Sequence, residues 1–301
     1  MNLAAEKRLK FIESRLYWEG WLRRGNIEDF FQISTPQATK DIKEYKERAP
    51  DNIVYDPVGK MYVAGKIFKP AFEEPSSEDY LNRLLNLKRK TSENEFFCGT
   101  ITNFATIPRM KRFVDTVVLR SLIKAINTQM SIKIVYQSMR KDLPTSRWIN
   151  PHSLAYDGNR WHIRALCHVK HLFSDFNLCR ILQVIELREN SIPSSLDYQW
   201  NTNVSLHIEP NSELSGGKRA CIELDYDMKD GKKEFNIPAA FYYYIKVNYG
   251  FDVNRDEEDG LKQQIILKNK NEVEQKVALL EELSKNAINS DIESGKIMVF
   301  E

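Results

Sequence analysis

The sequence predicts a multidomain α+β protein, because the spacing of its apolar residues changes along the chain. Apolar residues recur at helical spacing near the N-terminus, alternate with polar residues around the middle, and follow both patterns toward the C-terminus. A length of 301 residues exceeds one small domain, and 42% hydrophobic residues suffice for ordinary cores. We divide the chain into four segments: 1–69, 70–130, 131–193 and 194–301.

The first segment has the pattern of three short helices followed by a hairpin. Apolar residues at helical spacing predict a helix over about residues 5–18, a short one around Ile27 and a third that begins near Thr35. Thr35 can cap the third helix, and Pro36 suits its first position because the N–H that proline lacks is unpaired there anyway. Two β-rich pieces around a turn predict a hairpin over residues 53–64. This order is typical of a winged helix-turn-helix domain.

The third helix is the candidate for reading DNA sequence. In a winged helix-turn-helix this helix lies in the major groove, where Gln can pair with adenine, Lys with guanine and the Thr methyl with thymine. The expected base contacts are Thr35, Gln37, Thr39 and Lys40, and the expected phosphate contacts are Ser34, Lys43 and Lys60. Residues 1–69 hold thirteen Lys/Arg and ten Asp/Glu, a net of only +3. A solvated lysine face, or a domain that contacts protein, is therefore the alternative.

Residues 70–130 are expected to form a helical linker. Prolines mark its start, and Ser76 or Ser77 can cap a first helix. A longer helix over residues 113–126 then leads into the first strand of the middle segment. Packed helices move as rigid pieces, so such a linker would transmit a change in one domain to the orientation of another.

Residues 147–181 combine short strands with many basic and aromatic side chains. Apolar pieces at residues 161–167 and 176–181, separated by turn formers, predict antiparallel strands. Alternation along the first piece divides its side chains between a core face, Trp161, Ile163, Ala165 and Cys167, and a face open to a surface or cleft, His162, Arg164 and Leu166.

The charge of this region favours an anionic partner. Residues 131–190 hold nine Lys/Arg and five Asp/Glu, a net of +4, with four histidines in addition. Basic groups beside aromatic rings suit a phosphate or nucleotide better than a metal or an acyl group. Arg164 and Arg180 each need either a carboxylate partner, such as Asp175, or an anionic ligand, because an unpaired buried cation is unfavourable. The sequence leaves both alternatives open.

The order of these pieces resembles the WYL domain of bacterial transcriptional regulators. The matching blocks are residues 131–138, Arg147, residues 151–154, residues 158–165 and residues 175–181. The tripeptide that gives the family its name is Trp161-His162-Ile163 here, so Tyr is replaced by His and Leu by Ile. With these two replacements the chain resembles the subgroup of the family found beside anti-phage defence operons, the BREX- and CBASS-associated repressors. The resemblance is strong over roughly residues 120–190.

The resemblance implies a small Sm-like or SH3-like β-barrel with a positively charged ligand pocket. Tyr136 and Ser138 follow the family's pattern of a Tyr near the end of its first strand. The ligand-binding positions that the resemblance implies are Tyr136, Ser138, Arg147, His152, Arg164 and Arg180.

The last segment is expected to be a compact α+β unit. After a connector over residues 194–217, the patterns predict a strand at 220–226, a helix at 239–247, a strand at 264–267 and a helix at 272–283. In the family that this chain resembles, a C-terminal extension is commonly used in dimer contacts. From Phe251 onward the chain has seven basic and twelve acidic residues, which argues against DNA binding there.

Several function classes are not supported. No apolar run approaches the ~20 residues needed to span a bilayer, and the N-terminus lacks the apolar stretch of a secretory signal. We therefore expect a cytoplasmic protein without a membrane partner. Cys98, Cys167, Cys179 and Cys221 have no C-x-x-C spacing, so neither a metal nor another cofactor is expected.

Together these features favour a homodimeric, ligand-responsive transcriptional repressor. Two winged helices would grip an inverted repeat in double-stranded operator DNA, and a nucleotide or nucleic-acid effector in the WYL pocket would change their spacing. The alternative is a nucleic-acid-processing enzyme that uses the His/Arg cluster, although paired carboxylates for Mg²⁺ and a Walker-type glycine loop are missing. A protein-interaction adaptor is a third possibility, and it predicts no DNA binding.

Overall fold

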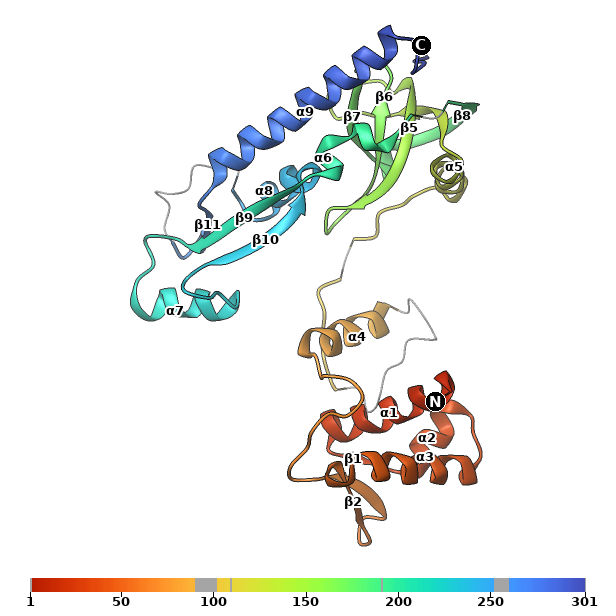
Figure 1. Cartoon of the computed structure of the whole chain (residues 1–301), viewed down its shortest axis with the longest axis vertical. Helices are drawn as coiled ribbons and strands as arrows, with labels where there is room; N and C mark the ends of the chain where they lie inside the picture. Colours follow the sequence, from red (N-terminus) through yellow and green to blue (C-terminus); the bar gives the residue numbers. More distant parts are fainter. Residues whose placement is uncertain (1, 90–101, 109, 191, 252–259, 301) are drawn as a thin grey trace. The chain divides into compact units, whose positions relative to one another are not determined.

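The computed structural model describes residues 2–89, 102–108, 110–190, 192–251 and 260–300. Contacts divide the chain into two units, Met1–Arg109 and Met110–Glu301, and each unit is described by itself (Figure 1). The finer division into four segments stays a prediction, and Cys98 lies outside the described residues. None of the helices in the described ranges is long and apolar enough to cross a membrane.

The N-terminal unit combines helices with a small sheet. Its elements are α1 (Leu3–Glu19), β1 (Trp21–Leu22), α2 (Arg24–Phe31), α3 (Thr35–Arg48), a 3-10 turn (Pro50–Asn52), β2 (Ile53–Asp56), β3 (Met61–Ala64) and α4 (Ser77–Arg89). The sheet has the order β1-β3-β2, and both pairs are antiparallel. The three helices and the hairpin confirm the predicted winged helix-turn-helix. Strand β1, which the sequence does not predict, pairs with the wing.

The orientation of α3 follows from the side chains that it buries. Tyr45 is fully buried and Ile42 is 3% exposed, both in one core with residues of α1. Fully burying a side chain of this size contributes about 1.5–3 kcal/mol, which fixes the inner face of the helix. Ser34 is the N-cap and Pro36 lies within the first turn, so the cap expected at Thr35 is wrong by one residue. Pro36 is still compatible with the helix at this position, because the N–H groups of a first helical turn lack intrahelical partners and proline has no N–H to leave unpaired.

The second unit begins with a helix and a five-stranded sheet. These elements are α5 (Thr116–Asn127), β4 (Met130–Tyr136), β5 (Thr145–Tyr156), β6 (Trp161–Cys167), β7 (Leu172–Asn177) and β8 (Ile181–Glu189). The strands pair antiparallel in the order β7-β6-β5-β4-β8. Helix α5 packs its Val118 and Leu122 into the core of this sheet. Closure of the sheet into a barrel stays a prediction, because the pairing leaves β7 and β8 as its edges.

The strand predicted at residues 176–181 is wrong. The chain leaves β7 at Asn177, makes a 3-10 turn over Leu178–Arg180, and starts β8 at Ile181. The Asn177 side chain accepts the backbone N–H of Cys179 at 3.0 Å, and such a local bond competes with strand pairing. Arg180 therefore lies in a turn and not inside a strand.

Both faces of β6 are covered, although the sequence predicts one open face. Ile163, Ala165 and Cys167 lie in the predicted core, but Trp161 is 49% exposed at the start of the strand. On the other face, Arg164 and Leu166 are also buried. The cover comes from the C-terminal part of the chain, which the sequence does not place there.

The remaining elements of the second unit, residues 194–300, form the predicted α+β fold with a different order, and this part is called the C-terminal unit. They are a 3-10 turn (Ser194–Leu196), α6 (Tyr198–Asn201), β9 (Asn203–Pro210), α7 (Gly216–Asp225), β10 (Lys233–Pro238), a 3-10 turn (Ala239–Phe241), α8 (Tyr242–Asn248), β11 (Ile265–Leu267) and α9 (Lys270–Glu293). The sheet order is β10-β9-β11. The predictions of a helix at 239–247, a strand at 264–267 and a helix at 272–283 are confirmed.

Two predictions in this segment are wrong. The strand expected at 220–226 is helix α7, in which Ile222 is buried while Leu224 is 81% exposed, so the apparent alternation does not reflect burial. The connector expected at 194–217 contains β9, the central strand of the sheet. Its Val204 and Leu206 are buried, in an alternation that the sequence does display.

The end of the chain returns to the five-stranded sheet (Figure 1). Ile288 of α9 is buried against Leu166 and Phe173. Beyond the helix, the Phe300 ring lies 4.9 Å from the ring of Trp148 on β5. The sheet and the C-terminal unit are thus packed on each other along α9.

Candidate nucleic-acid interface and effector site

The outer side of α3 presents most of the residues expected to meet DNA. Ala38, Asp41 and Ile42 turn inward, whereas Thr39 and Lys40 are left on the surface. The exposed members of the predicted set are Ser34, Thr35, Thr39, Lys40 and Lys43 along this helix and Lys60 at the turn of the wing. The Thr39 hydroxyl already donates to the carbonyl oxygen of Thr35 at 2.9 Å.

Gln37 differs from the rest of the set because its side chain is engaged inside the domain. Its Nε2 donates to Oδ1 of Asp41 at 2.9 Å, and Asp41 is 1% exposed. Asp41 also accepts from Arg8 of α1 through Nε at 2.6 Å and Nη2 at 3.2 Å. Reading an adenine through two hydrogen bonds would require Gln37 to leave Asp41.

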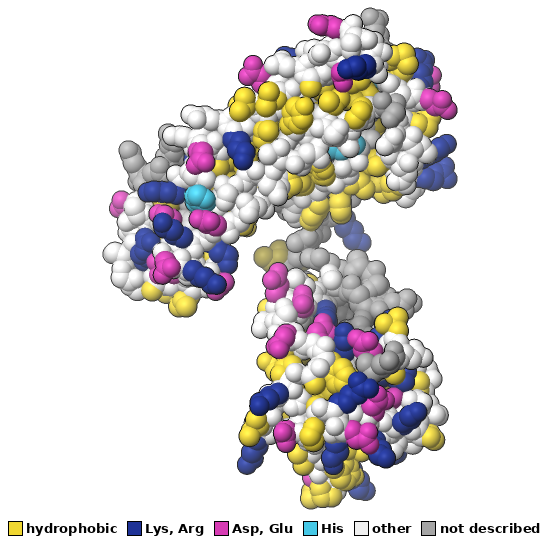
Figure 2. Space-filling model, viewed as in Figure 1, with side chains coloured by type: hydrophobic (Ala, Val, Ile, Leu, Met, Phe, Trp, Pro, Cys, Tyr) yellow, Lys and Arg dark blue, Asp and Glu magenta, His cyan; other side chains and the backbone are white. Residues whose placement is uncertain are grey.

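The surface charge of this unit is mixed, as Figure 2 shows for the face in view, where basic and acidic side chains are interspersed. This agrees with the small net charge of residues 1–69. DNA binding here would depend on contacts from individual side chains of α3 and the wing more than on the general electrostatic attraction of a basic surface.

The six ligand positions predicted in the middle segment fall into two groups, one at the end of β4 and one on the face of the sheet that the C-terminal unit covers. Tyr136, Ser138, Arg147 and Arg180 gather at the end of β4: Tyr136 pairs with Thr145 and Ile181, and Gln137 N–H donates to the Arg180 carbonyl at 3.0 Å. Arg147 pairs with Ile134 of the inner core. His152 and Arg164 instead belong to a second cluster, on the face covered by the C-terminal unit.

Arg147 is a cation with spare hydrogen-bonding capacity between aromatic rings. Its guanidinium carbon lies 5.6 Å from the ring centroid of Tyr136 and 5.9 Å from that of Phe176. Nη2 donates to Oγ1 of Thr145 at 2.5 Å. Its buried Nε has no hydrogen-bond partner, and no carboxylate pairs with it in the described part of the chain. A buried donor without an acceptor is the feature that an anion would satisfy.

Arg180 is half-buried, and among the described residues it has no acidic partner. Asp175, the carboxylate expected to pair with it, accepts instead from Arg164 at 3.4 Å and from the Tyr244 hydroxyl at 2.9 Å. Ser138 accepts the backbone N–H of Arg140 at 3.2 Å. Among the described residues, neither Arg147 nor Arg180 has its charge matched by an internal carboxylate.

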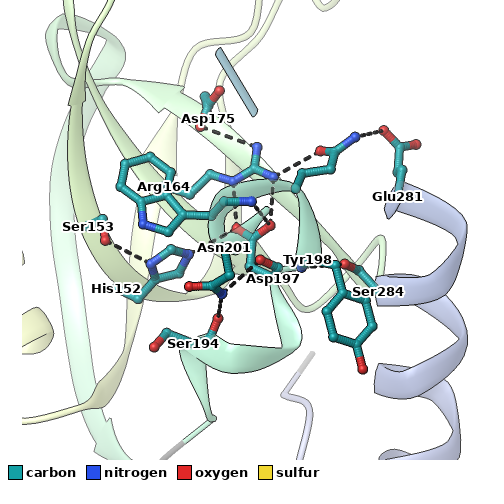
Figure 3. Close-up of polar contacts among 12 residues, drawn as sticks. His152, Ser153, Arg164, Asp175, Ser194, Asp197, Tyr198, Asn201, Glu281 and Ser284 are labelled. Carbon is teal, nitrogen blue, oxygen red and sulfur yellow. Dashed lines mark hydrogen bonds and ion pairs between the residues drawn. The ribbon is translucent and has the colours of Figure 1, made fainter. Parts of the chain in front are cut away.

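Arg164 and His152 converge on Asp197, just before α6 (Figure 3). Arg164 binds this carboxylate through two parallel hydrogen bonds, Nε to Oδ2 at 2.7 Å and Nη2 to Oδ1 at 3.0 Å. His152 Nε2 lies 3.0 Å from Oδ2, and its ring also contacts Phe173 and Trp200, with centroids 5.5 and 5.6 Å apart. Asp197 is fully buried. The anion bound by these two residues is therefore internal.

The charges of this pair stabilise each other. Burial on its own raises the pKa of Asp197, but hydrogen bonds from His152 and Arg164 outweigh it and hold the pKa below its ordinary value. Burial likewise lowers the pKa of Arg164, whereas Asp197 and Asp175 raise it by more. Both groups are therefore ionised, and the ion-pair alternative holds for Arg164.

The Asp197 cluster joins the sheet to α9. Gln199 accepts from Arg164 Nη2 at 3.0 Å and donates to the carbonyl oxygen of Val277 at 3.0 Å. Tyr198 N–H donates to Ser284 Oγ at 2.9 Å. The sequence shows that Arg164 needs a partner, but Asp197 lies in the stretch expected to be a connector. The sequence did hold one signal for this residue, because Asp is a preferred N-cap. Asp197 is the N-cap of α6, and its side chain accepts the N–H of Trp200.

A groove of about 770 Å³ borders the same cluster, between β7, α8 and α9. Its lining includes four carboxylates, Asp175, Glu274, Glu281 and Glu282, and three cations, Arg164, Lys246 and Lys285. Arg164 is already neutralised by Asp197, so the groove does not favour an anion. The end of β4 is the better candidate for an anionic effector.

A winged helix-turn-helix, a basic antiparallel sheet and a C-terminal α+β unit in one chain are the parts expected of a DNA-binding transcription regulator. Three family models match in that order. They are the BrxR transcriptional regulator winged helix-turn-helix domain over residues 4–86, the WYL domain over residues 117–186, and the BrxR transcriptional regulator C-terminal dimerization domain over residues 203–273.

Relatives of known function match along most of the chain. The DNA-binding transcriptional repressor CapW of Escherichia coli (strain KTE188) is 36% identical over 270 residues, 89% of this chain and 90% of that protein. CapW of Pseudomonas aeruginosa is 34% identical over 271 residues, with 89% and 90% covered. The chain belongs to the BrxR/CapW family of WYL-domain transcriptional repressors, which confirms the resemblance to the defence-associated subgroup. The family is one of repressors and not of enzymes.

A solved structure, proteasome accessory factor B/C (PafBC) of Arthrobacter aurescens, aligns with 94% of this chain at 14% identity and a TM-score of 0.26. The chain spans about half of that protein, 49% of its length. A likeness this low carries no argument about function.

Proposed function

We propose that this chain represses transcription as a homodimer bound to an inverted repeat in operator DNA, and that an anionic effector regulates it. The exposed polar stripe of α3, in a chain of the BrxR/CapW family, is the observation that carries the proposal. The controlled genes would be an anti-phage defence operon, since the chain falls in the defence-associated subgroup.

Thr35, Thr39 and Lys40 would meet base edges from the first turns of α3, where a reading helix contacts the major groove. Ser34, Lys43 and Lys60 would hold phosphates and so fix the register of the domain on DNA. Gln37 would read a base only after exchanging its bond to Asp41, and in the meantime it orients α3 against α1.

The homodimer is supported by the match of residues 203–273 to a dimerization domain. Two-fold symmetry would present two α3 helices to half-sites about one or two helical turns apart, multiples of ~10 bp. The separation of the two helices would then decide whether both half-sites are bound together.

The effector would be a nucleotide or a nucleic-acid fragment whose phosphate binds Arg147 and Arg180 beside Tyr136 and Ser138. The unpaired Nε of Arg147 and the flanking rings support this class of ligand. His152 and Arg164, also expected in this pocket, would instead hold the sheet to the C-terminal unit through Asp197.

The two groups would be coupled through β7. Phe176 faces Arg147, and the preceding residue, Asp175, binds Arg164. An effector that draws Arg147 away from Phe176 would shift β7 beside the Asp197 cluster and thereby change how the C-terminal units are held.

Electrophoretic mobility shift on the duplex upstream of the protein's own gene tests the proposal. Replacing Thr39 and Lys40 together by Ala should weaken DNA binding. Each base contact that is lost should cost about 1–3 kcal/mol, which is roughly 5- to 150-fold in affinity for that contact. Lys46→Ala, an exposed lysine in the last turn of α3, is the matched control and should change affinity little. Unchanged binding by the double variant would refute the assigned reading helix.

A further inference from the structure

Asp41 of α3 is a charged side chain buried where α1 packs on α3. It is 1% exposed, and its carboxylate accepts three side-chain hydrogen bonds. Two come from Arg8 of α1, through Nε to Oδ2 at 2.6 Å and Nη2 to Oδ1 at 3.2 Å. The third comes from Gln37, one helical turn before Asp41, through Nε2 to Oδ1 at 2.9 Å. The charge of Asp41 is thus matched inside the domain, and the same carboxylate holds a side chain of the reading helix.

Asp41 determines which end of the Gln37 amide is engaged. Thr39 and Lys40 on the same helix are exposed, whereas Gln37 is half-buried. A carboxylate that faces an arginine only accepts hydrogen bonds, so Asp41 holds the amino end of the amide and not its carbonyl end. A glutamine reads adenine with both ends, since the carbonyl oxygen accepts from N6 and the amino group donates to N7. The amino group of Gln37 therefore already has an acceptor inside the domain.

The contact with Asp41 competes with DNA for the same amide. A hydrogen bond to a charged group is stronger than one between neutral groups, and both bonds between glutamine and adenine are neutral. Leaving Asp41 would also remove one of the three donors of a carboxylate that is almost fully buried. Exchanging Asp41 for adenine therefore brings little net gain, and the base beside Gln37 is bound with little preference.

We propose that Asp41 is a specificity-determining residue of the DNA interface although it contacts no base, because it withholds Gln37 and leaves base discrimination to the other polar residues of α3. The inference rests on the proposed function, in which α3 is the reading helix. Asp41 and Arg8 act through Gln37, so they are positioning residues. All three side chains belong to α1 and α3 of the N-terminal unit.

The preference for each base pair of a half-site tests the role of Asp41. The probes are the inverted repeat footprinted upstream of the protein's own gene and duplexes in which one base pair of one half-site is replaced by each alternative. Mobility-shift titrations with the full-length protein give affinity ratios between probes, and these ratios do not depend on the active fraction of a preparation. Asp41→Ala should gain a preference for adenine of about fivefold or more at one position, because the released amide can pair with N6 and N7.

Gln37→Ala on its own should change every ratio by less than about twofold, because the side chain is withheld in the wild-type protein. Added to Asp41→Ala, it should abolish the gained preference. Glu44→Ala is the matched control: it removes another carboxylate of α3, one that pairs with Arg48, and should keep the wild-type ratios.

A second variant keeps the test valid if Asp41→Ala folds poorly. Arg8→Met combined with Asp41→Leu replaces the buried ion pair by apolar side chains, a change that is often neutral or stabilising, and it should gain the same preference. Wild-type ratios in the folded variants would overturn the inference, as would loss of an adenine preference in Gln37→Ala alone. Failure of the wild-type protein to bind any of these duplexes would contradict the proposed function instead.

Discussion

The guanidinium of Arg164 and the carboxylate of Asp197 form an ion pair with two hydrogen bonds, at 2.7 and 3.0 Å. The pair joins the five-stranded sheet to the start of the C-terminal unit. Asp197 is fully buried and Arg164 is 4% exposed. Their 33 residues of sequence separation are closed by packing and not by local structure. Stability, ligand response and dimer geometry are all expected to depend on this contact.

Asp197→Ala should destabilise the C-terminal unit by about 3–5 kcal/mol, because it leaves Arg164 a buried cation with only Asp175 at 3.4 Å nearby. Urea unfolding at neutral pH measures the effect. Asp142→Ala, which removes an exposed carboxylate from the loop between β4 and β5, should change stability by less than about 0.5 kcal/mol. An Asp197→Ala cost below about 1 kcal/mol would show that the pair is dispensable.

Arg147→Met should weaken binding of a short 5′-phosphorylated single-stranded DNA by about 1.5–3 kcal/mol, roughly 10- to 150-fold, because a charged donor is lost. Isothermal titration calorimetry with the full-length protein measures this. Lys170→Met removes an exposed cation from the loop between β6 and β7 and should leave binding unchanged. Equal losses in the two variants would point to non-specific attraction and against an effector site at the end of β4.

Acid should weaken the fold through His168. Burial, with a smaller contribution from nearby His171, lowers the pKa of His168 to about 4. Its Nδ1 accepts the Phe300 N–H at 2.9 Å, and its Nε2 lies 2.7 Å from Asn150 Oδ1, so the neutral ring is built into the structure.

The unfolded chain takes up this proton below about pH 6.5, whereas the folded chain resists it until about pH 4. The contribution of His168 to stability, up to about 3 kcal/mol, is therefore complete above pH 6.5 and is lost as the pH falls toward 4. Unfolding midpoints at several pH values, compared with those of His168→Asn, test this. An equal acid dependence in both proteins would assign the loss to other groups.

Gly65→Ala should destabilise the N-terminal unit by about 1–3 kcal/mol. A Cβ at this position would lie 1.7 Å from the carbonyl oxygen of Asp51, a backbone atom that cannot move aside cheaply. Gly25→Ala in α2 is the matched control, since nothing lies within 4 Å of its added Cβ, and it should be neutral or slightly stabilising. Thermal unfolding of the two variants separates these outcomes.

The parts of the fold that depend on local pattern were predictable. The helical spacing of Leu9, Ile12 and Leu16 identified α1, and a β-rich pair around a turn identified the wing. Strand β9 was missed even though Val204 and Leu206 alternate, because polar residues on both sides gave the stretch the character of a connector. The residues that β9 pairs with are also far from it in the sequence: Leu206 pairs with Phe235, and Ile208 with Leu267.

The site was predictable only in its chemistry. The sequence showed that Arg164 requires an anion, and this is a property of the residue and its strand. Which anion it meets is decided by how α6 folds back onto β6, a tertiary event with no local signature. For the same reason the sequence could not show that Arg147 belongs to the group at the end of β4 whereas Arg164 lies on the face that the C-terminal unit covers.

The place of Trp200 gives the chain a spectroscopic reporter of its own. The indole packs against His152, and its backbone N–H binds Asp197, so any rearrangement that opens this cluster alters the surroundings of the ring. Trp148 is almost fully enclosed and Trp161 is half in water, both on the five-stranded sheet, while Trp18 and Trp21 belong to the N-terminal unit. The fluorescence of a variant that keeps Trp200 and has Phe at the other four tryptophans can therefore follow the movement of the sheet against the C-terminal unit without any attached label.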